Sequence, residues 1–230
     1  MLCKIADLYV EIPKAGGMAS RLGNYLTEDN VSPDIVIRED QYDAKRWPHV
    51  APEFIPYMDS GLAFYIRLYK FGGMMLHASA VELDGRAYLF SGPSGMGKST
   101  HTRLWQQEFP SARVFNDDKP ALRLLDGVWY AYGTPWCGKD GININMKVPL
   151  AGICFLRRGT QNSIRRLSLL EATVAVVSQS NRRFATAQGL GYLTDVVERL
   201  VQDVPIWELK CLPEPEAAHL SYETMRGGKI

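Results

Sequence analysis

The segment Gly92–Thr100, which reads Gly-Pro-Ser-Gly-Met-Gly-Lys-Ser-Thr, has the residue types and spacing of a loop that binds nucleotide phosphates. Its glycines permit tight turns that bring backbone amides against phosphate oxygens. Lys98 supplies a mobile cation for the β- and γ-phosphates, and the Ser99 hydroxyl is suited to bind Mg²⁺. We therefore predict that a nucleotide binds to the residues Gly92, Pro93, Ser94, Gly95, Met96, Gly97, Lys98, Ser99 and Thr100.

The residues on either side of this loop give it the context that the motif requires. A strand-like run, Ala87–Ser91, precedes the loop, and Thr100–Phe109 has the composition of a helix. A helix that begins near Lys98 directs its positive dipole end and its free amides at the same anion. A chance glycine-rich turn is the alternative interpretation. His101, in the first turn of this helix, is expected on its surface.

Two carboxylates follow a second strand-like run. Ala112–Phe115 leads into Asn116, Asp117 and Asp118, and Asp117 comes nineteen residues after Lys98. If this strand lies beside the strand that carries the loop, its carboxylates come next to Mg²⁺, which takes one or two carboxylates besides phosphate oxygens and waters. Adjacent aspartates point in different directions, so one can bind the metal while the other accepts the proton of a substrate hydroxyl. A solvated turn is the alternative.

His77 is the third candidate. It lies on the first arm of an expected hairpin with Asp84-Gly85 as its turn, and Arg86–Ser91 as the second arm. An antiparallel partner places His77 near the end of the strand from which the phosphate loop starts. The alternative is an ordinary core or surface histidine.

Three further cationic residues could contact the phosphates or the acceptor. Arg157 and Arg158 follow the apolar, strand-like run Leu150–Leu156, so a guanidinium there can meet the oxygens of a transferred phosphoryl group. Surface arginines are the alternative. The loop Gly133–Lys139 either places Lys139 at the acceptor or phosphate, or is a rigid turn.

Composition narrows the class of protein. The 230 residues carry a net charge of +1 without long blocks of one sign, which argues against nonspecific binding to nucleic acid or membranes as the main activity. No apolar run reaches the roughly 18 residues that a membrane-spanning helix needs. The N-terminus lacks a secretory pattern, and the four cysteines form no CxxC pair. We expect a cytoplasmic globular protein with reduced thiols.

Strand-like and helical runs alternate with hairpins, which indicates an α/β fold with more hairpins than a doubly wound sheet contains. We expect residues 1–72 to form a small N-terminal α+β extension packed on the core, with strand-like runs at Ile5–Ile12 and Asp34–Ile37. Residues 73–212 are the expected catalytic core, and residues 213–230 a polar C-terminal tail, partly mobile.

The order of these features resembles a known family. A histidine followed by small residues, a hairpin, the glycine-rich loop, a helix and a strand that ends in two aspartates is similar to the catalytic core of HPr kinase/phosphorylase and to the nucleotide end of phosphoenolpyruvate carboxykinases. His77–Pro120 together with Gly133–Lys139 most resembles the HPr-kinase-like proteins of bacteria, whose substrates are mostly unassigned. Some of those relatives act with peptide-modification systems and others phosphorylate free serine.

The resemblance implies a mixed β-sheet P-loop core and roles for single residues. His77 would lie near the phosphate and metal, Asp117 would be the catalytic base, and Asp118 would bind Mg²⁺ with Ser99. Lys98 and Arg157 complete the set of catalytic residues that we predict.

We therefore expect a Mg-dependent, ATP-dependent kinase that phosphorylates a hydroxyl group. The acceptor that we expect is a serine in a peptide or small molecule. A non-catalytic nucleotide-binding regulatory module and a serine kinase/phosphorylase of the HPr type are the alternatives. The sequence leaves open whether the donor is ATP, ADP, GTP or pyrophosphate, and whether the chain forms a homo-oligomer.

Overall fold

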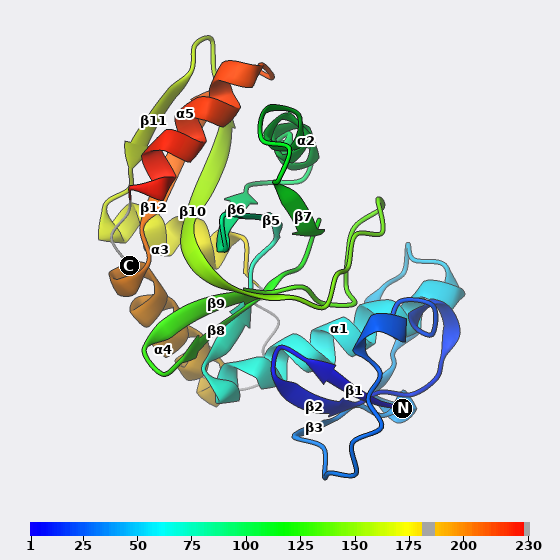
Figure 1. Ribbon diagram of the computed structural model, residues 1–230. Coiled ribbons are helices and arrows are strands. Elements are labelled where there is room, and N and C mark those ends of the chain that lie inside the picture. Colours follow the sequence, from blue (N-terminus) through cyan, green and yellow to red (C-terminus); the bar gives the residue numbers. More distant parts are fainter. Residues whose placement is uncertain (181–186, 228–230) are drawn as a thin grey trace.

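The computed structural model describes residues 1–180 and 187–227 as a mixed α/β structure (Figure 1). Within these residues, nine strands form one mixed sheet, with the order β4-β8-β9-β10-β6-β5-β7, with β12 also paired to β10 and β11 paired to β12. The strands of this sheet are β4 (Gly73–Met75), β5 (Ala78–Leu83), β6 (Arg86–Ser91), β7 (Arg113–Asn116), β8 (Ala121–Leu125), β9 (Val128–Tyr132), β10 (Lys147–Arg158), β11 (Ser163–Arg166) and β12 (Ile206–Cys211).

The long strand β10 joins the two parts of the sheet. Its first residues pair antiparallel with β9, and from Leu150 onward it pairs parallel with β6 and then with β12. Strand β5 runs antiparallel to both β6 and β7 and lies between them. The carboxyl ends of β6, β7, β10 and β12 therefore meet at one edge of the sheet, which is where ligands bind in open α/β sheets.

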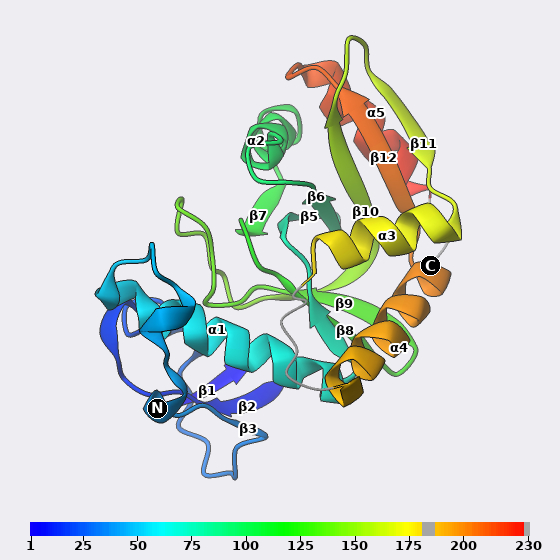
Figure 2. The same cartoon turned by 180° about the vertical axis from the view of Figure 1, so that it is seen from behind.

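Helices cover both faces of the sheet (Figures 1 and 2). α2 (Lys98–Glu108) and α5 (Pro215–Arg226) pack on one face, where Trp105 and Met225 share a core with Phe90 and Trp207. α3 (Leu169–Ser178) and α4 (Ala187–Asp203) cover the other face. Ser168 begins α3 with a capping box, in which its side chain and that of Glu171 exchange hydrogen bonds with the backbone.

The N-terminal residues form a separate three-stranded sheet of β1 (Leu2–Ile5), β2 (Leu8–Glu11) and β3 (Ile35–Val36). This sheet packs on α1 (Ile55–Leu68), and the two share a core with Tyr132 and Trp136. Among the described residues, no helix has both the length and the apolar character needed to cross a membrane. Each of the four cysteines, Cys3, Cys137, Cys154 and Cys211, is a free thiol.

Several sequence predictions need correction. The predicted strand Ile5–Ile12 is interrupted, because Ala6 and Asp7 adopt positive φ angles and turn the chain between β1 and β2. The sequence places the two aspartates next to Mg²⁺ on the condition that β7 lies beside β6. This condition is not met, because β5 lies between the two strands, so β6 and β7 are about two strand spacings, or roughly 10 Å, apart.

The C-terminal region also differs from the prediction. Instead of a polar tail, Pro215–Arg226 forms helix α5, and its alanines and Met225 are buried against α2. As a result His101, predicted on the surface of α2, is only 3% exposed and contacts Ser221 of α5. Residues 181–186 of the predicted core and 228–230 of the predicted tail lie outside the described residues.

Candidate functional site

The glycine-rich loop connects β6 to α2 at the edge where the parallel strands end. Gly92, Gly95 and Gly97 have φ angles of 145°, 76° and 103°, a region that residues with a Cβ rarely adopt. A Cβ on Gly92 would also lie close to its neighbours, 3.3 Å from Cγ of Met96 and 3.4 Å from the carbonyl oxygen of Leu156. The glycines therefore make this loop conformation attainable.

Lys98 begins α2 and folds back over the loop. Its Nζ donates hydrogen bonds to the carbonyl oxygens of Gly92 (2.9 Å) and Pro93 (3.3 Å), and the residue is 9% exposed. Burial lowers the pKa of Lys98, and the negative charge of Asp118 opposes part of this effect. The ammonium group thus already lies at the loop, within the electrostatic field of the carboxylates.

Asp117 is held by the backbone of the loop that contains Gly138. Its Oδ1 accepts a hydrogen bond from the Gly138 amide (2.6 Å), and its Oδ2 accepts one from the Asp140 amide (3.2 Å). Burial raises the pKa of the Asp117 carboxyl, and the Gly138 amide opposes this shift. Gly138 is required for the close approach, since a Cβ on it would lie 2.8 Å from Oδ2 of Asp117.

Asp118 lies between two cationic or polar partners. Its Oδ1 is 3.1 Å from Nε2 of His77, and its Oδ2 forms an ion pair with Lys119. Burial alone would raise the pKa of Asp118, but the hydrogen bond from His77 and the charge of Lys119 outweigh it and lower the pKa to about 2. Asp118 is therefore an anion at neutral pH, whereas the pKa of Asp117 moves in the opposite direction.

Asn116 orients the two aspartates. Its side-chain oxygen accepts hydrogen bonds from the amides of Asp118 (3.1 Å) and Lys119 (2.8 Å), and its amide nitrogen donates to the Thr134 carbonyl (3.0 Å). This local turn is the arrangement that asparagine side chains favour. It fixes the chain direction directly after β7, so that both carboxylates face the loop.

His77 is fixed from several sides at the start of β5. Its backbone amide donates to the carbonyl oxygen of Gln179, its Nδ1 is 3.2 Å from Oε1 of the same residue, and its carbonyl oxygen accepts from the Ser91 hydroxyl. The register of the hairpin pairs Ala78 with Ser91, as the sequence predicts for the arms around Asp84-Gly85. His77 thus lies beside the first residue of the loop.

One cavity of about 570 Å³ brings most of the predicted site residues together. The loop residues Gly138 and Lys139 contribute to the same wall. Arg103 of α2 also lines it, although its sequence position does not mark it as a site residue. The cavity is lined by His77, Ser94, Gly95, Gly97, Lys98, Ser99, Thr100, Arg103, Asp117, Asp118, Gly138 and Lys139. Gly92, Pro93, Met96 and Arg157 do not line it.

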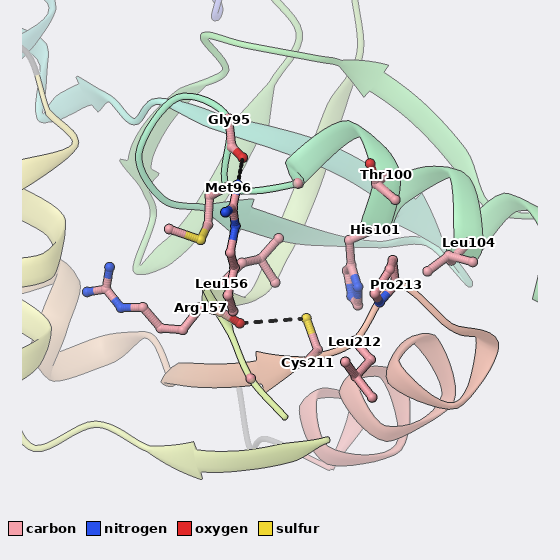
Figure 3. Close-up of a pocket in the computed structure, with 13 residues that line it drawn as sticks. Gly95, Met96, Thr100, His101, Leu104, Leu156, Arg157, Cys211, Leu212 and Pro213 are labelled. Carbon is pink, nitrogen blue, oxygen red and sulfur yellow. Dashed lines mark hydrogen bonds between the residues drawn. The ribbon is translucent and has the colours of Figure 1, made fainter. Parts of the chain in front are cut away.

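A second, more apolar cavity of about 320 Å³ adjoins the loop (Figure 3). It shares Gly95, Gly97 and Thr100 with the first cavity and continues between α2 and the ends of β10 and β12. Its remaining lining residues are Met96, His101, Leu104, Leu156, Arg157, Arg158, Gly159, Cys211, Leu212 and Pro213.

Arg157 belongs to this second cavity. Its side chain extends away from His101 and Leu104 in Figure 3, and its Nε lies 3.3 Å from the carboxylate of Glu208. Arg158, by contrast, donates to the Gly95 carbonyl oxygen (3.4 Å). Of the two arginines, Arg158 is the one that contacts the glycine-rich loop.

The donor set fits a magnesium ion that a nucleotide brings with it. No group of three or more His, Cys, Asp or Glu side chains converges on one point in the described part of the chain. Mg²⁺ is commonly held by one or two carboxylates, with phosphate oxygens and waters completing its six ligands. Ser99 and the anionic Asp118 line the same cavity and supply oxygens of this kind.

Lys119 is the main site residue that sequence reasoning missed. It lies between the Asp pair and Pro120, a position at which a lysine is usually a solvated turn residue. The hydroxyl groups of Tyr65 and Thr134 donate to its carbonyl oxygen at 2.6 and 2.8 Å, and these contacts come from distant parts of the chain. The one sequence feature that could have indicated its role is that it is the third consecutive charged residue after a strand.

The fold and the cavity together define a mixed α/β protein with a glycine-rich strand–loop–helix segment and two aspartates at one edge of its sheet. The chain belongs to the family described as SynChlorMet cassette protein ScmC, whose family model matches residues 53–211. The matched residues include His77, the glycine-rich loop and both aspartates.

Among solved structures, the chain is similar to the Hpr(Ser) kinase/phosphatase from Coxiella burnetii. That similarity has a TM-score of 0.38 and 12% sequence identity, and it covers 66% of this chain and 88% of the other. A comparison with curated proteins gives no match.

Proposed function

We propose that this chain is a Mg-dependent phosphotransferase that transfers the terminal phosphoryl group of a nucleotide to a hydroxyl group, with serine in a peptide or small molecule as the acceptor. The observation that carries this proposal is the convergence of Lys98, Ser99, His77 and the two aspartates on one cavity. Phosphoryl transfer requires in-line positioning and compensation of charge more than covalent chemistry by the protein.

The loop and Lys98 account for the donor side of the reaction. Residues of the loop and of the first turn of α2 line the cavity that would receive the phosphates, and free amides at a helix N-terminus bind such anions. In the complex, Lys98 would exchange its bonds to the loop carbonyls for bonds to the β- and γ-phosphates. Ser99 and Asp118 would hold Mg²⁺, which would supply charge compensation for the transferred group.

Asp117 accounts for the acceptor side. As the acceptor oxygen forms its bond to phosphorus and the bond to the β–γ bridging oxygen breaks, the hydroxyl proton passes to the carboxylate of Asp117. The two amide donors fix this carboxylate in place, and Asp117 lines the same cavity as the loop. Lys139 lies in the same wall and can neutralise charge on the acceptor or phosphate.

The apolar cavity in Figure 3 favours a nucleotide over pyrophosphate as the donor. It continues directly from the loop, and it offers Met96, Leu104 and Leu156 to the flat faces of a base. Among the described residues, its lining contains no Asp or Glu, whose carboxylates accept hydrogen bonds from both N1 and N2 of guanine, so ATP is the donor that we expect.

The proposed function is tested by measuring phosphoryl transfer to an acceptor. Purified protein is incubated with Mg–ATP, free serine and a pool of serine-containing peptides, and the acceptors are searched by mass spectrometry for an added phosphate. We expect phosphorylation that Lys98→Met and Asp117→Asn abolish while both variants keep the fold. Binding of ATP without turnover on any acceptor would instead identify a non-catalytic nucleotide-binding module and would contradict the proposal.

A further inference from the structure

Arg103 brings a guanidinium group to the wall of the phosphate cavity. It lies in α2, four residues after Ser99, and side chains at this spacing share one face of a helix. Both residues line the cavity of about 570 Å³ that the glycine-rich loop also lines. The arginine therefore extends from the same helix face as the hydroxyl group that would bind Mg²⁺.

The guanidinium group of Arg103 contacts the connection between β9 and β10, which extends toward α2 in Figures 1 and 2. Nη2 of Arg103 lies 3.0 Å from Oδ2 of Asp140 in this connection. The backbone amide of Asp140 in turn donates to Oδ2 of Asp117 at 3.2 Å. A single residue thus links the guanidinium group to the carboxylate that we propose as the base.

These two relationships locate Arg103 with respect to the reaction. Ser99 belongs to the donor side of the site and Asp117 to the acceptor side. In phosphoryl transfer the phosphorus atom moves between a metal-bound donor and the acceptor oxygen. Because Arg103 shares a helix face with Ser99 and is linked to Asp117 through Asp140, it lies where the transferred group would pass.

Among the described residues that line this cavity, Arg103 is the one arginine. Arg157 lines the second cavity and pairs with Glu208, and Lys119 pairs with Asp118. A planar guanidinium group can donate two parallel hydrogen bonds to the oxygens of one phosphoryl group, which the ammonium group of a lysine does not. Arg103 therefore combines the required chemistry with the required place.

The ion pair with Asp140 leaves Arg103 able to bind a phosphoryl group. The two side chains are 62% and 30% exposed, and ion pairs between exposed groups are weak because water and salt screen them. Hydrogen bonds from arginine to a phosphate are frequently bidentate and are strengthened by charge. The bond from Asp140 to Asp117 uses the backbone amide, so it does not require the side-chain pair.

We propose that Arg103 is a further catalytic residue, which donates hydrogen bonds to the oxygens of the transferred phosphoryl group. This inference rests on the proposed function and gives Arg103 the phosphoryl contact that the sequence predicts for Arg157. The acceptor oxygen bonds to the γ-phosphorus, the bond from phosphorus to the β–γ bridging oxygen breaks, and its electron pair leaves with the nucleoside diphosphate. The hydroxyl proton passes to Asp117, while Arg103 compensates the charge on the three other oxygens of the transferred group.

The first experiment detects this contact without turnover. The NMR resonance of the Arg103 Nε–H group, assigned by its loss in Arg103→Lys, is recorded with saturating Mg–ADP and with saturating Mg–AMPPNP, a triphosphate analogue that resists hydrolysis. We expect a larger shift with Mg–AMPPNP, because ADP lacks the γ-phosphate. The Nε–H group of Arg199 is the matched control, since its pair with Asp203 has similar exposure, 57% and 28%, and it should shift with neither nucleotide.

Equal shifts of the Arg103 resonance with the two nucleotides, or no shift with either, would overturn the inference. The backbone amides of Gly95 and Gly97 report nucleotide binding in the same spectra. If these amides shift while the Arg103 resonance does not, the inference fails and the proposed function stands. If neither shifts, the nucleotide site and the proposed function fail as well.

The second experiment measures kcat on the acceptor that mass spectrometry identifies. We expect Arg103→Ala to lower kcat by about 1,000-fold, as for other arginines that stabilise this transition state, while the Kd of Mg–ATP changes far less. Asp140→Asn should lower kcat by about fivefold or less, the effect of losing an exposed ion pair. Arg199→Ala should leave kcat unchanged.

The comparison with Asp140→Asn separates catalysis from positioning of the loop. An equal loss of kcat in Asp140→Asn and Arg103→Ala would mean that Arg103 acts by holding Asp140, and it would overturn the inference, as would an unchanged kcat in Arg103→Ala. Both results leave the proposed function standing. If the wild-type protein phosphorylates no acceptor, the proposed function fails and the assignment of Arg103 as a catalytic residue fails with it.

Discussion

The imidazole Nε2 of His77 lies 3.1 Å from Oδ1 of Asp118, although the two residues lie on different strands and 41 positions apart in the chain. His77 precedes β5, and Asp118 follows β7, which pairs with β5. The amide of Ala78 also donates to the carbonyl oxygen of Asp118 at 3.0 Å. The backbone pairing of β5 with β7 therefore sets the distance between the two side chains.

Replacement of His77 tests whether this contact positions the carboxylate. We expect His77→Ala to lower kcat by about 10- to 100-fold, the usual effect of removing a group that orients a metal ligand. The Kd of the nucleotide should change much less, because the loop and Lys98 remain. Steady-state kinetics with measured ATP binding separate the two quantities. His49→Ala, at an exposed histidine, is the control, and an equal loss there would contradict the assignment.

Gly138 gives a second test of geometry. A methyl group at this position would lie 2.8 Å from Oδ2 of Asp117, so we expect Gly138→Ala to displace the carboxylate. Displacement by about 1 Å can lower a rate about 100-fold. Gly23→Ala is the matched control, because a Cβ there has nothing within 4 Å. Retention of full turnover in Gly138→Ala would show that the position of Asp117 is not critical.

Because His101 is buried, we predict that the free energy of unfolding depends on pH. Burial lowers its pKa to about 4, whereas an exposed histidine in the unfolded chain titrates near 6.5. Between these pH values the unfolded state binds more protons, so the free energy of unfolding falls as the pH drops from about 6.5 to about 4. The full difference corresponds to about 3 kcal/mol.

Urea unfolding of the wild-type protein and of His101→Gln at pH 7.5 and pH 5 measures this effect. The wild-type protein should lose more stability over that interval than the variant does, because glutamine does not titrate. Equal losses in both proteins would mean that His101 is accessible to protons in the folded state, contrary to its packing under α5.

The packing of helix α5 on α2 should contribute to the free energy of unfolding. Met225 is fully buried in the core that α5 shares with Trp105 of α2. We expect Met225→Ala to lower the free energy of unfolding by about 2–5 kcal/mol. Glu223→Ala, at an exposed position of the same helix, should change it by about 0.5 kcal/mol or less. Similar effects of both substitutions in chemical denaturation would argue against the packing of α5.

Short-range signals made the centre of the fold predictable. The turn at Asp84-Gly85, where both residues have positive φ, and the glycine pattern of the loop determine their own conformations locally. These two features, read from the sequence, place His77 beside the loop. The roles of the site residues stay predictions, to be decided by the variants described above.

Other features depended on contacts between distant segments. Nothing local in Arg113–Asn116 indicates that β5 will separate it from β6. In Pro215–Arg226 polar residues outnumber the apolar ones that pack on α2, so the segment has the composition of a polar tail. Ala6 and Asp7 turn the chain without the glycine that usually marks such a turn. The ion pair of Lys119 with Asp118 likewise depends on a carbonyl oxygen held by Tyr65 and Thr134.

The most direct test of the account is calorimetric titration of Mg–ATP into the wild-type protein, Lys98→Met and Lys70→Met. Lys98 contacts the loop that would hold the phosphates, whereas Lys70 is exposed in the short helical turn Tyr69–Phe71 that follows α1. We predict at least a tenfold higher Kd for Lys98→Met, equivalent to about 1.4 kcal/mol, and an unchanged Kd for Lys70→Met. Equal affinities in all three proteins, or no binding to the wild-type protein, would contradict a nucleotide site at Gly92–Ser99.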